Sequence, residues 1–464
     1  MKMIEPNLMK MKYFERAFME SQADRLMSKL NIHPDIKQFE IYLNSHLDKS
    51  IEYEEGFIKA AHQKSTFGIG LRLIGTEGRE GMTFTSDYSE RALEQIITNG
   101  IKMMKAATPN PDFKSLAFPS KTYQKVEGIY DPSIEGIAIE DLDKIFDPIF
   151  ALKQKNLAPI GLSGGFSATL GAVHILNSNG IQNYELATNV GISASVNLLR
   201  DDNFGSGFYW QSSPFISKIN ADNIANVSYD MALRGLKKSP IETGDYPIIL
   251  SPIATANFLV DPILAGINAE SVQNNMSFLC NKLNQQIGAD LLTVEDNPHI
   301  NGQIGTQSFD DEGVATRPMK IIEKGFLKEL YHNSFTAGKA DCESNGHATR
   351  AGYAGRVMIS NHNVQMEAGS RKKDDIIAEI KKGIYFDYTG DSPNAITGDF
   401  SGLIMHGYVI EDGQIGDALL ETLIGINLLD AYKRIEIISK ERQWVDENYM
   451  PWVKLSSATI SSRA

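Results

Sequence analysis

The feature that most constrains the fold is an order of segments that occurs twice in the first 240 residues. Several stretches of alternating apolar and polar residues are followed each time by one helical pattern, at about residues 31–107 and again at about 139–238. Alternation with a period of two predicts strands, because successive side chains of a strand point to opposite faces. The sequence therefore predicts an α+β fold whose N-terminal α/β region has two similar strand-then-helix halves.

The individual elements of this region follow from the same periodicities. We expect strands at residues 39–43, 51–61 with a bend at Gly56, 68–74, 81–85, 161–169, 172–176, 182–187, 191–199 and 205–210. We expect helices at residues 13–30, 89–105, 139–153 and 221–236.

A Pro- and Gly-containing stretch at residues 239–247 predicts a boundary between domains 1–240 and 241–464. A helix is expected from Ser251-Pro252 to Asn268, since proline at the first helical position sacrifices no hydrogen bond. Shorter helices are expected at 270–282, 374–382 and 427–439, with a last strand at 451–460. The rest of this domain reads as strands and turns.

Two similar phrases predict how those strands are arranged. Ile322-Glu323-Lys324-Gly325 and Ile410-Glu411-Asp412-Gly413 each place a turn between apolar strands. They indicate two related hairpins in one sheet, and so a mainly β C-terminal domain that is curved or barrel-like, with a few helices.

Composition excludes several classes of function. The net charge of -13 and the absence of a long basic run argue against direct nucleic-acid binding. Two cysteines in 464 residues indicate a reducing compartment. No apolar run approaches the ~18 residues that cross a bilayer. We therefore expect a cytoplasmic protein without direct membrane contact.

Motifs for metal or nucleophilic catalysis are missing. None of the nine histidines is followed by glutamate, so neither HExxH nor HExxxH occurs, and there is no Cys-x-x-Cys pair. The dispersed histidines of the C-terminal half lack helical i, i+4 spacing. The sequence predicts no catalytic residue and no metal ligand in this chain.

The polar stretch at residues 306–350 is the candidate binding region. Asp310, Asp311, Glu312 and Gly313 have two interpretations: a polar turn whose carboxylates accept backbone N–H groups or pair with Arg317, or a general base or groove wall. A second polar segment, Asn345-Gly346-His347 with Arg350, has the small and polar residues that line grooves.

These residues carry a resemblance to a known family. The ordered motifs are Phe309–Val314, Ile322–Gly325, Thr336-Ala337, Asn345-Gly346 with Arg350, Lys382-Gly383, Thr397–Ser401, Ile410–Gly413 and Pro451. Together they resemble the TldD/PmbA family, also called modulator of DNA gyrase, and the likeness extends more loosely through the N-terminal half.

The resemblance distinguishes two branches. TldD-type subunits carry a zinc-binding HExxxH on a helix early in the C-terminal domain, with a late cysteine as a further ligand. Here Leu259–Ala265 takes that position, and no cysteine follows Cys342. The chain therefore resembles the TldE/PmbA branch, whose members pair with TldD to form a metalloprotease acting on small or unfolded peptides.

The resemblance implies a non-catalytic subunit that encloses peptide while a TldD-like partner supplies zinc. We expect the peptide to add as a strand near Asp310–Val314 and Ser344–Arg350. The predicted groove residues are Asp310, Asp311, Glu312, Gly313, Asn345, Gly346, His347, Arg350, Thr397, Gly398 and Asp399. Two alternatives stay open: a self-sufficient metal-dependent hydrolase using Asp310, Glu312 and a histidine such as His347, or a stand-alone peptide-binding homodimer.

Overall fold

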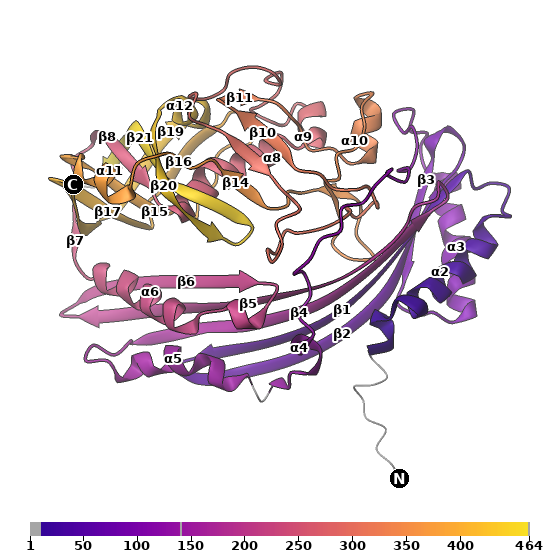
Figure 1. Ribbon diagram of the computed structural model, residues 1–464, viewed down its shortest axis with the longest axis horizontal. Coiled ribbons are helices and arrows are strands. Elements are labelled where there is room, and N and C mark those ends of the chain that lie inside the picture. The colour runs from indigo at the N-terminus through magenta and orange to yellow at the C-terminus, as the bar shows by residue number, and fades with distance from the viewer. Residues whose placement is uncertain (1–10, 140–141, 463–464) are drawn as a thin grey trace, which may run out of the picture.

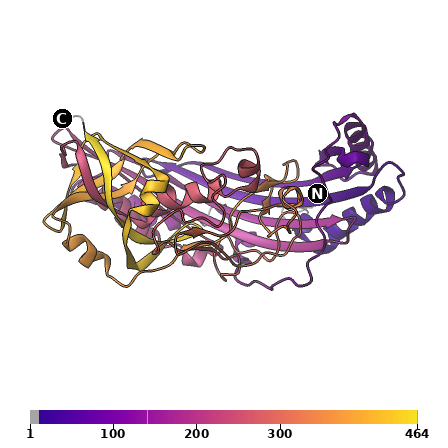
Figure 2. The same ribbon diagram turned by 90° about the horizontal axis from the view of Figure 1, so that it is seen from above.

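The computed structural model describes residues 11–139 and 142–462. Figure 1 shows a long, curved N-terminal sheet that runs beneath a second body formed by the C-terminal half. Seen from above, the C-terminal body covers one end of this sheet, while helices α2 (Arg16–Leu30) and α3 (Glu90–Ala106) lie at the other (Figure 2). The two halves of the chain thus form two stacked parts with a shared interface.

The N-terminal sheet has six antiparallel strands in the order β3-β2-β1-β4-β5-β6. Their bounds are β1 Gln38–Glu54, β2 Phe57–Ile74, β3 Glu80–Thr85, β4 Gly161–Asn177, β5 Gln182–Arg200 and β6 Asn203–Ser213. Helix α3 follows the first three strands, and α6 (Ala221–Arg234) follows the second three. This order confirms the two strand-then-helix halves, which meet where β1 pairs with β4.

The strands are longer than predicted. Strands β1, β4 and β5 are each continuous where the sequence predicted two short strands. The expected bend at Gly56 is the hairpin turn between β1 and β2, and Gly56 has a φ of 83°. The glycines of the predicted strand 68–74 lie within β2, and Gly70 has a packing reason that lies elsewhere in the chain. A Cβ on Gly70 would lie 2.2 Å from the carbonyl oxygen of Tyr353.

The predicted helix at 139–153 is also wrong. In the described residues it is three short pieces, η4 (Asp143–Phe146), α5 (Asp147–Phe150) and η5 (Ala151–Gln154), while residues 140–141 lie outside the described part. Pro148 explains the interruption, because proline lacks the N–H that a continuous helix needs and restricts the residue before it.

The C-terminal half forms one branched, mixed sheet of thirteen strands. Its strands are β7 Lys238–Ser239, β8 Gly244–Leu250, β9 Val294–Asp296, β10 Met319–Glu323, β11 Phe326–Leu327, β14 Val364–Met366, β15 Lys382–Tyr388, β16 Asp399–Leu403, β17 His406–Glu411, β18 Gln414–Leu419, β19 Thr422–Asn427, β20 Ile435–Val445 and β21 Asn448–Ser462. A separate small hairpin joins β12 (Ala348–Thr349) to β13 (Met358–Ile359). Both predicted hairpins are confirmed, as β10–β11 and β17–β18.

Several short helices accompany this sheet. They are α7 Pro252–Ala254, the π-helix η7 Thr255–Val260, α8 Asp261–Gly266, α9 Ala269–Gln273, α10 Ser334–Lys339, α11 Lys373–Ala378 and α12 Leu428–Lys433. The first three form the nearly continuous helix expected after Ser251, whose side chain accepts from the backbone N–H of Ala254. Its apolar side packs into the main C-terminal core with Ile248, Leu250 and Phe386.

The other predicted helices of this half are too long. The one at 270–282 ends at Gln273, and Asn275 then takes a left-handed φ of 56°. The one at 427–439 ends at Lys433, because residues from Ile435 onward pair with β21. Tertiary pairing overrides the local helical pattern there.

The domain division at residue 240 stays a prediction. What the structure shows is that the chain passes from the first sheet to the second between Ser213, the end of β6, and Lys238, the start of β7. A small apolar cluster that includes Tyr42, Ile175, Phe309 and Val314 packs the two parts together.

Candidate functional site

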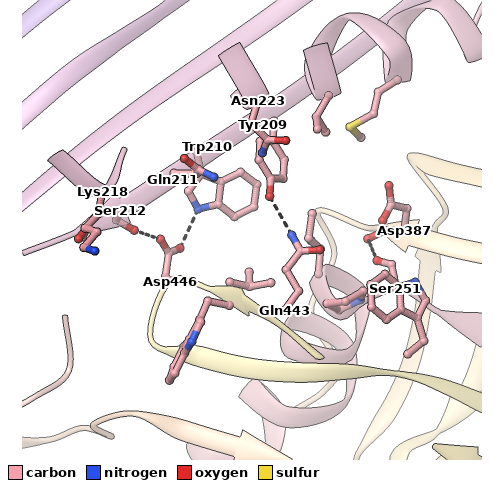
Figure 3. Close-up of a pocket in the computed structure, with 18 of the residues that line it drawn as sticks. Tyr209, Trp210, Gln211, Ser212, Lys218, Asn223, Ser251, Asp387, Gln443 and Asp446 are labelled. Atoms are coloured by element: carbon pink, nitrogen blue, oxygen red, sulfur yellow. Dashed lines mark hydrogen bonds between the residues drawn. The ribbon is translucent and has the colours of Figure 1, made fainter. Parts of the chain in front are cut away.

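A cavity of about 1000 Å³ lies between the last strand of the N-terminal sheet and the C-terminal sheet (Figure 3). Strand β6 and helix α6 form one wall, and β15, β17 and the β20–β21 hairpin form the opposite wall. All three tryptophans of the chain line it: Trp210, Trp444 and Trp452. The volume is that of a site for a sizeable organic ligand.

Asp446 joins the two walls of the cavity. It occupies the turn between β20 and β21 with a φ of 51°, and its carboxylate accepts a hydrogen bond from Trp210 Nε1 at 2.8 Å. The same carboxylate accepts from the Ser212 hydroxyl. Figure 3 shows Asp446 reaching toward both β6 side chains. The contact fixes the Trp210 indole against the cavity from across the interface.

Other aromatic side chains of the cavity are fixed through their polar atoms. Gln443 Nε2 donates to the Tyr209 hydroxyl at 2.8 Å, and Trp452 Nε1 donates to the Tyr385 hydroxyl at 3.0 Å. Because these polar tips already have partners, the ring faces are what a ligand meets. Rigid aromatic faces in a concave site favour apolar side chains of a ligand.

Charged groups lie at one side of the same cavity. Burial raises the pKa of Asp387, an effect that its hydrogen bond with Ser251 and the positive charge of Arg234 oppose. The Arg234 guanidinium lies 5.7 Å from the centre of the Tyr408 ring. Burial, and then the charge of Asp387, raise the pKa of Tyr408 to about 12. Tyr408 is therefore a neutral hydroxyl at physiological pH.

A second, smaller cavity of about 380 Å³ adjoins the first and shares Val445 and Asp446 with it. One wall is a face of the helix that runs through η7 and α8, which presents Asn257 and Asp261. Burial, and then the negative charge of Glu447, raise the pKa of Asp261 to about 7.

The family resemblance implies zinc on this helix in one branch, and zinc requires histidine, cysteine or carboxylate ligands. The stretch Leu259–Ala265 contains neither histidine nor cysteine. Across residues 11–139 and 142–462, no group of three or more His, Cys, Asp and Glu side chains is placed to hold a metal ion. The residues of the described chain therefore do not fit a zinc site.

The predicted acids at 310–312 lie in the interface between the two parts. The Asp310 carboxylate accepts backbone N–H groups from Glu312, Val314 and Ala348 at 2.9–3.0 Å. Burial, and then the nearby charge of Glu312, raise the pKa of Asp310. Gly313 has the left-handed φ of 78° that closes this turn. The backbone-accepting interpretation thus describes Asp310.

The neighbouring acids bind the N-terminal sheet. Glu312 contacts Arg72 of β2 at 3.3 Å. Asp311 accepts from the Tyr42 hydroxyl at 2.8 Å and from the backbone N–H of Arg350 at 2.7 Å. The Arg350 guanidinium in turn pairs with Glu40 of β1. Arg317, which the sequence offered as a partner of the acids, contacts Glu329 instead.

The polar groups of the segment around His347 also have partners inside the protein. Asn345 accepts from the backbone of His332 at 2.8 Å, and Gly346 has a φ of 80° against the carbonyl of Ala315. The two ring nitrogens of His347 contact the Ser360 carbonyl oxygen at 2.9 Å and the sulfur of Met319 at 3.2 Å. Burial holds the pKa of His347 well below its usual value.

The third predicted group, Thr397, Gly398 and Asp399, lies in an exposed turn before β16. Asn427 donates to the Asp399 carboxylate at 2.9 Å, and Gly398 packs against Phe278. Within the described residues no hydrogen bond joins this turn to 310–350. The structure therefore brings the first two groups together and leaves the third apart.

Sequence reasoning missed the residues of the large cavity. Tyr209, Trp210, Asp387, Gln443 and Asp446 come from β6, β15 and the β20–β21 hairpin, which are distant in the sequence. One signal was available, because three tryptophans in 464 residues are few and all of them line one site.

The fold places an aromatic-lined cavity between the two sheets. Two family models match the sequence: "PmbA/TldA metallopeptidase domain 1" over residues 39–104 and "PmbA/TldA metallopeptidase C-terminal domain" over residues 243–462. The chain belongs to the TldD/PmbA family, as its motifs predicted.

Individual relatives agree with this assignment. The metalloprotease MJ0996 of Methanocaldococcus jannaschii is 24% identical over 416 residues, covering 87% of this chain and 89% of the relative. A protein of Saccharolobus solfataricus named zinc metalloprotease TldD homolog is 29% identical over 207 residues, 44% of this chain and 46% of its own. The crystal structure of TldE from Thermococcus kodakarensis superposes with a TM-score of 0.84 at 22% identity, covering 96% and 99% of the two chains.

Proposed function

We propose that this chain is the TldE/PmbA-like, non-catalytic subunit of a TldD/TldE-type metallopeptidase and encloses small or unfolded peptides. The observation that carries the proposal is the tryptophan-lined cavity of about 1000 Å³ in a chain whose described residues offer no zinc donor set. The fold similarity to TldE supports this branch of the family.

The cavity supplies what a peptide of mixed sequence needs. Its aromatic faces accept apolar side chains, and the amides of Gln211, Asn223 and Gln443 can bond to peptide groups. Strand β6 is the last strand in the order of its sheet, so a peptide can add along its outer edge by main-chain hydrogen bonds.

The eleven residues singled out from sequence keep a place in this proposal. Asp310–Gly313 and Asn345–Arg350 hold the C-terminal part against β1 and β2 through the Asp311, Glu312 and Arg350 contacts. We propose that they shape the groove by fixing that interface. A direct peptide contact at these segments, and at Thr397–Asp399, stays a prediction.

We further propose a TldD-like, HExxxH-bearing partner that supplies zinc, with both chains in the cytoplasm and no direct nucleic-acid contact. A relative named as a zinc metalloprotease supports zinc elsewhere in the family. Among residues 11–139 and 142–462 no helix is both long and apolar enough to cross a membrane.

The test uses the tryptophans as reporters, since all three line the cavity. Titration of the purified chain with a short, unstructured apolar peptide should change its intrinsic fluorescence, and the isolated chain should leave the peptide intact. Adding the HExxxH-bearing relative from the same genome should give a stable complex that cleaves the peptide faster than that relative alone.

Two outcomes would contradict the proposal. One equivalent of zinc in the isolated chain together with peptide cleavage would establish the self-sufficient hydrolase, and loss of that activity in Glu312→Gln would locate it. Peptide binding by a homodimer that forms no complex with the relative would establish the stand-alone binding protein.

A further inference from the structure

Two sheet edges face each other across the large cavity. Strand β6 pairs only with β5, and over residues 442–445 strand β20 pairs only with β21. Consecutive residues of both strands line the cavity, 209–213 of β6 and 443–445 of β20. Because successive side chains of a strand point to opposite faces, consecutive lining residues mean that each strand turns its edge toward the cavity. Within the described chain these segments have no further main-chain partner, so both edges are open to an extended ligand.

Side-chain contacts show in which direction the two edges run. The Tyr209 hydroxyl accepts a hydrogen bond from Gln443. Further along both strands, Asp446 accepts from Trp210 and Ser212. Later residues of β6 thus face later residues of β20, so the two strands run in the same direction. A strand placed between them is antiparallel to both or parallel to both, and antiparallel pairing is the more stable arrangement.

Helix α6 gives the cavity a length and two different ends. The helix runs antiparallel to β6, since Ala232 in its last turn packs against Gly205 near the start of the strand. One face of the helix lines the cavity from Asn223 to Arg234. This distance is roughly 16 Å along a helix, which corresponds to about five residues of extended chain. Lys218 lies before the helix at one end of the cavity, and Arg234 is the last helical residue at the other.

Arg234 is a cation without a counter-ion at its end of the cavity. It is exposed, and among the described residues its guanidinium forms no ion pair and no hydrogen bond. Its charge acts on Asp387 and Tyr408, and Figure 3 shows Asp387 at the side of the cavity opposite Lys218. Asp230 and Asp387 also line the cavity, yet neither pairs with Arg234, and burial raises the pKa of Asp387. The guanidinium is therefore accessible to an anionic group of a ligand.

We infer that Arg234 binds a carboxylate of the enclosed peptide, which lies extended between β6 and β20 with its carboxyl end toward this arginine. A strand antiparallel to β6 has its last residue near the start of β6, where the end of α6 carries Arg234. The planar guanidinium can donate two N–H groups to the two oxygens of one carboxylate, which the ammonium of Lys218 cannot do with the same geometry. The inference rests on the proposed peptide-binding function.

Three N-acetylated pentapeptides of the same apolar sequence separate the sources of the carboxylate. The first has a free carboxyl terminus, the second a C-terminal amide, and the third a C-terminal amide with glutamate as its last residue. Binding is measured at pH 7 by tryptophan fluorescence. We expect at least one carboxylate-bearing peptide to bind about tenfold more tightly than the neutral amide, as a charge-assisted, bidentate contact predicts. The peptide that gains identifies the terminus or the side chain as the source.

Variants assign the gain to Arg234. Arg234→Gln should remove most of the tenfold preference, and Arg234→Lys, which keeps the charge without the planar fork, should keep part of it. Arg91→Gln is the matched control, because Arg91 is an exposed arginine of α3 that does not line this cavity. It should keep the full preference. Since Arg234 is exposed, its variants should melt at the temperature of the unmodified chain, so that a lost preference reports binding and not misfolding.

The direction of the peptide has a test of its own. A peptide with benzoylphenylalanine as its first residue and a free carboxyl terminus is photo-crosslinked to the chain, and mass spectrometry locates the bond. Crosslinks to residues 212–218 or to Asp446 would support the antiparallel peptide. Crosslinks to Tyr408 or to the last turn of α6 would overturn it. A carboxylate preference that Lys218→Gln removes and Arg234→Gln keeps would likewise show that the peptide runs parallel to β6.

The outcomes of the two proposals are distinguishable. Equal binding of all three peptides to the unmodified chain rejects the carboxylate site and leaves peptide binding intact. If no peptide binds, the proposed function fails, and sodium 3-phenylpropionate becomes the probe. Calorimetric binding of 3-phenylpropionate that disappears in Arg234→Gln would still support the site, whereas no binding would reject it.

Discussion

The buried acids at 310–312 and the acids around the β20–β21 turn are both clusters of carboxylates at the interface between the two sheets, yet their surroundings differ. Asp310, Asp311 and Glu312 have partners for their charge: backbone N–H groups, Tyr42 and Arg72. Asp261 and Glu447 face a cavity with no ion pair among the described residues. The acids of the first region stabilise the fold through these partners, whereas Asp261 has a long hydrogen bond from Asn448 Nδ2 at 3.4 Å and no counter-charge.

The largest expected effect tests the first region. Replacing Glu312 with alanine removes a buried partner of Arg72, whose side chain is 8% exposed. Arg72 keeps its pair with Glu80 at 3.1 Å, but it loses its fully buried partner, and the backbone N–H of Ser334 loses its acceptor. The free energy of unfolding should therefore fall by about 3 kcal/mol in urea denaturation.

The control for that variant is Glu323→Ala, which removes one side of the exposed pair with Lys320 and should leave the free energy of unfolding nearly unchanged. If Glu312→Ala and Glu323→Ala lost similar stability, the acids at 310–312 would not be the structural cluster described above.

Asp446 belongs to both cavities and should give the next largest effect. Asp446→Ala frees the Trp210 indole and the Ser212 hydroxyl, so peptide affinity should fall about tenfold and stability by about 1–2 kcal/mol. Affinity is measured by calorimetry, because the variant alters the tryptophan signal.

A matched variant exists in the β17–β18 hairpin. Asp412 has a φ of 45° against 51° for Asp446, so alanine meets the same backbone strain in both turns. Asp412→Ala should lower stability without changing peptide affinity. Equal affinity losses in the two variants would show that Asp446 has no special role at the cavity.

The pH dependence of stability tests the second region. Burial, and then the negative charges of Glu447 and Asp446, raise the pKa of Asp261 to about 7. Asp296 in turn acts on Glu447. Between its ordinary pKa near 3.8 and about 7 the folded chain binds more protons at this group than the unfolded chain does, so this contribution to stability falls as pH rises.

Asp261→Asn should therefore raise the melting temperature relative to the unmodified chain more at pH 8 than at pH 5. Glu411→Gln, which replaces an exposed acid of the β17–β18 hairpin, should show no such difference between the two pH values. If Asp261→Asn changed the melting temperature equally at pH 5 and pH 8, the pKa of the Asp261 carboxyl would not be near 7.

The smallest effect is expected at the exposed turn before β16. Asp399→Ala removes the hydrogen bond from Asn427 and should lower the free energy of unfolding only slightly, because the group is exposed. The peptide affinity of this variant tests the prediction that Thr397–Asp399 line the groove. A tenfold loss of affinity would establish these residues as part of the groove. An unchanged affinity would show that they are not.

Much of the fold was predictable because it depends on local pattern. The two strand-then-helix halves, the helix after Ser251 and both Gly-containing hairpins follow from periodicity, capping and turn chemistry. The failures have tertiary causes. Residues 62–67, which the pattern left outside a strand, belong to β2 because they pair with β1, and residues after Ile435 left a helical pattern because β21 pairs with them.

The site was harder to predict for the same physical reason. Asp310, Glu312 and His347 are chemically versatile, but their roles depend on which partners surround them, and those partners lie on β2, β10 and the segment after β13. The tryptophans gave a weaker signal in the sequence, although all three line the cavity of about 1000 Å³.

By itself, the sequence determined the family, the α+β class, the hairpins and the absence of a zinc motif, since these depend on residue identity and spacing along the chain. Only the tertiary structure decided which acids are neutralised and which face a cavity. Charge and hydrogen-bonding states depend on groups brought together from distant parts of the chain. Trp210 meets Asp446 only because the two sheets pack against each other, and Asp261 meets Asn448 only within the folded C-terminal half.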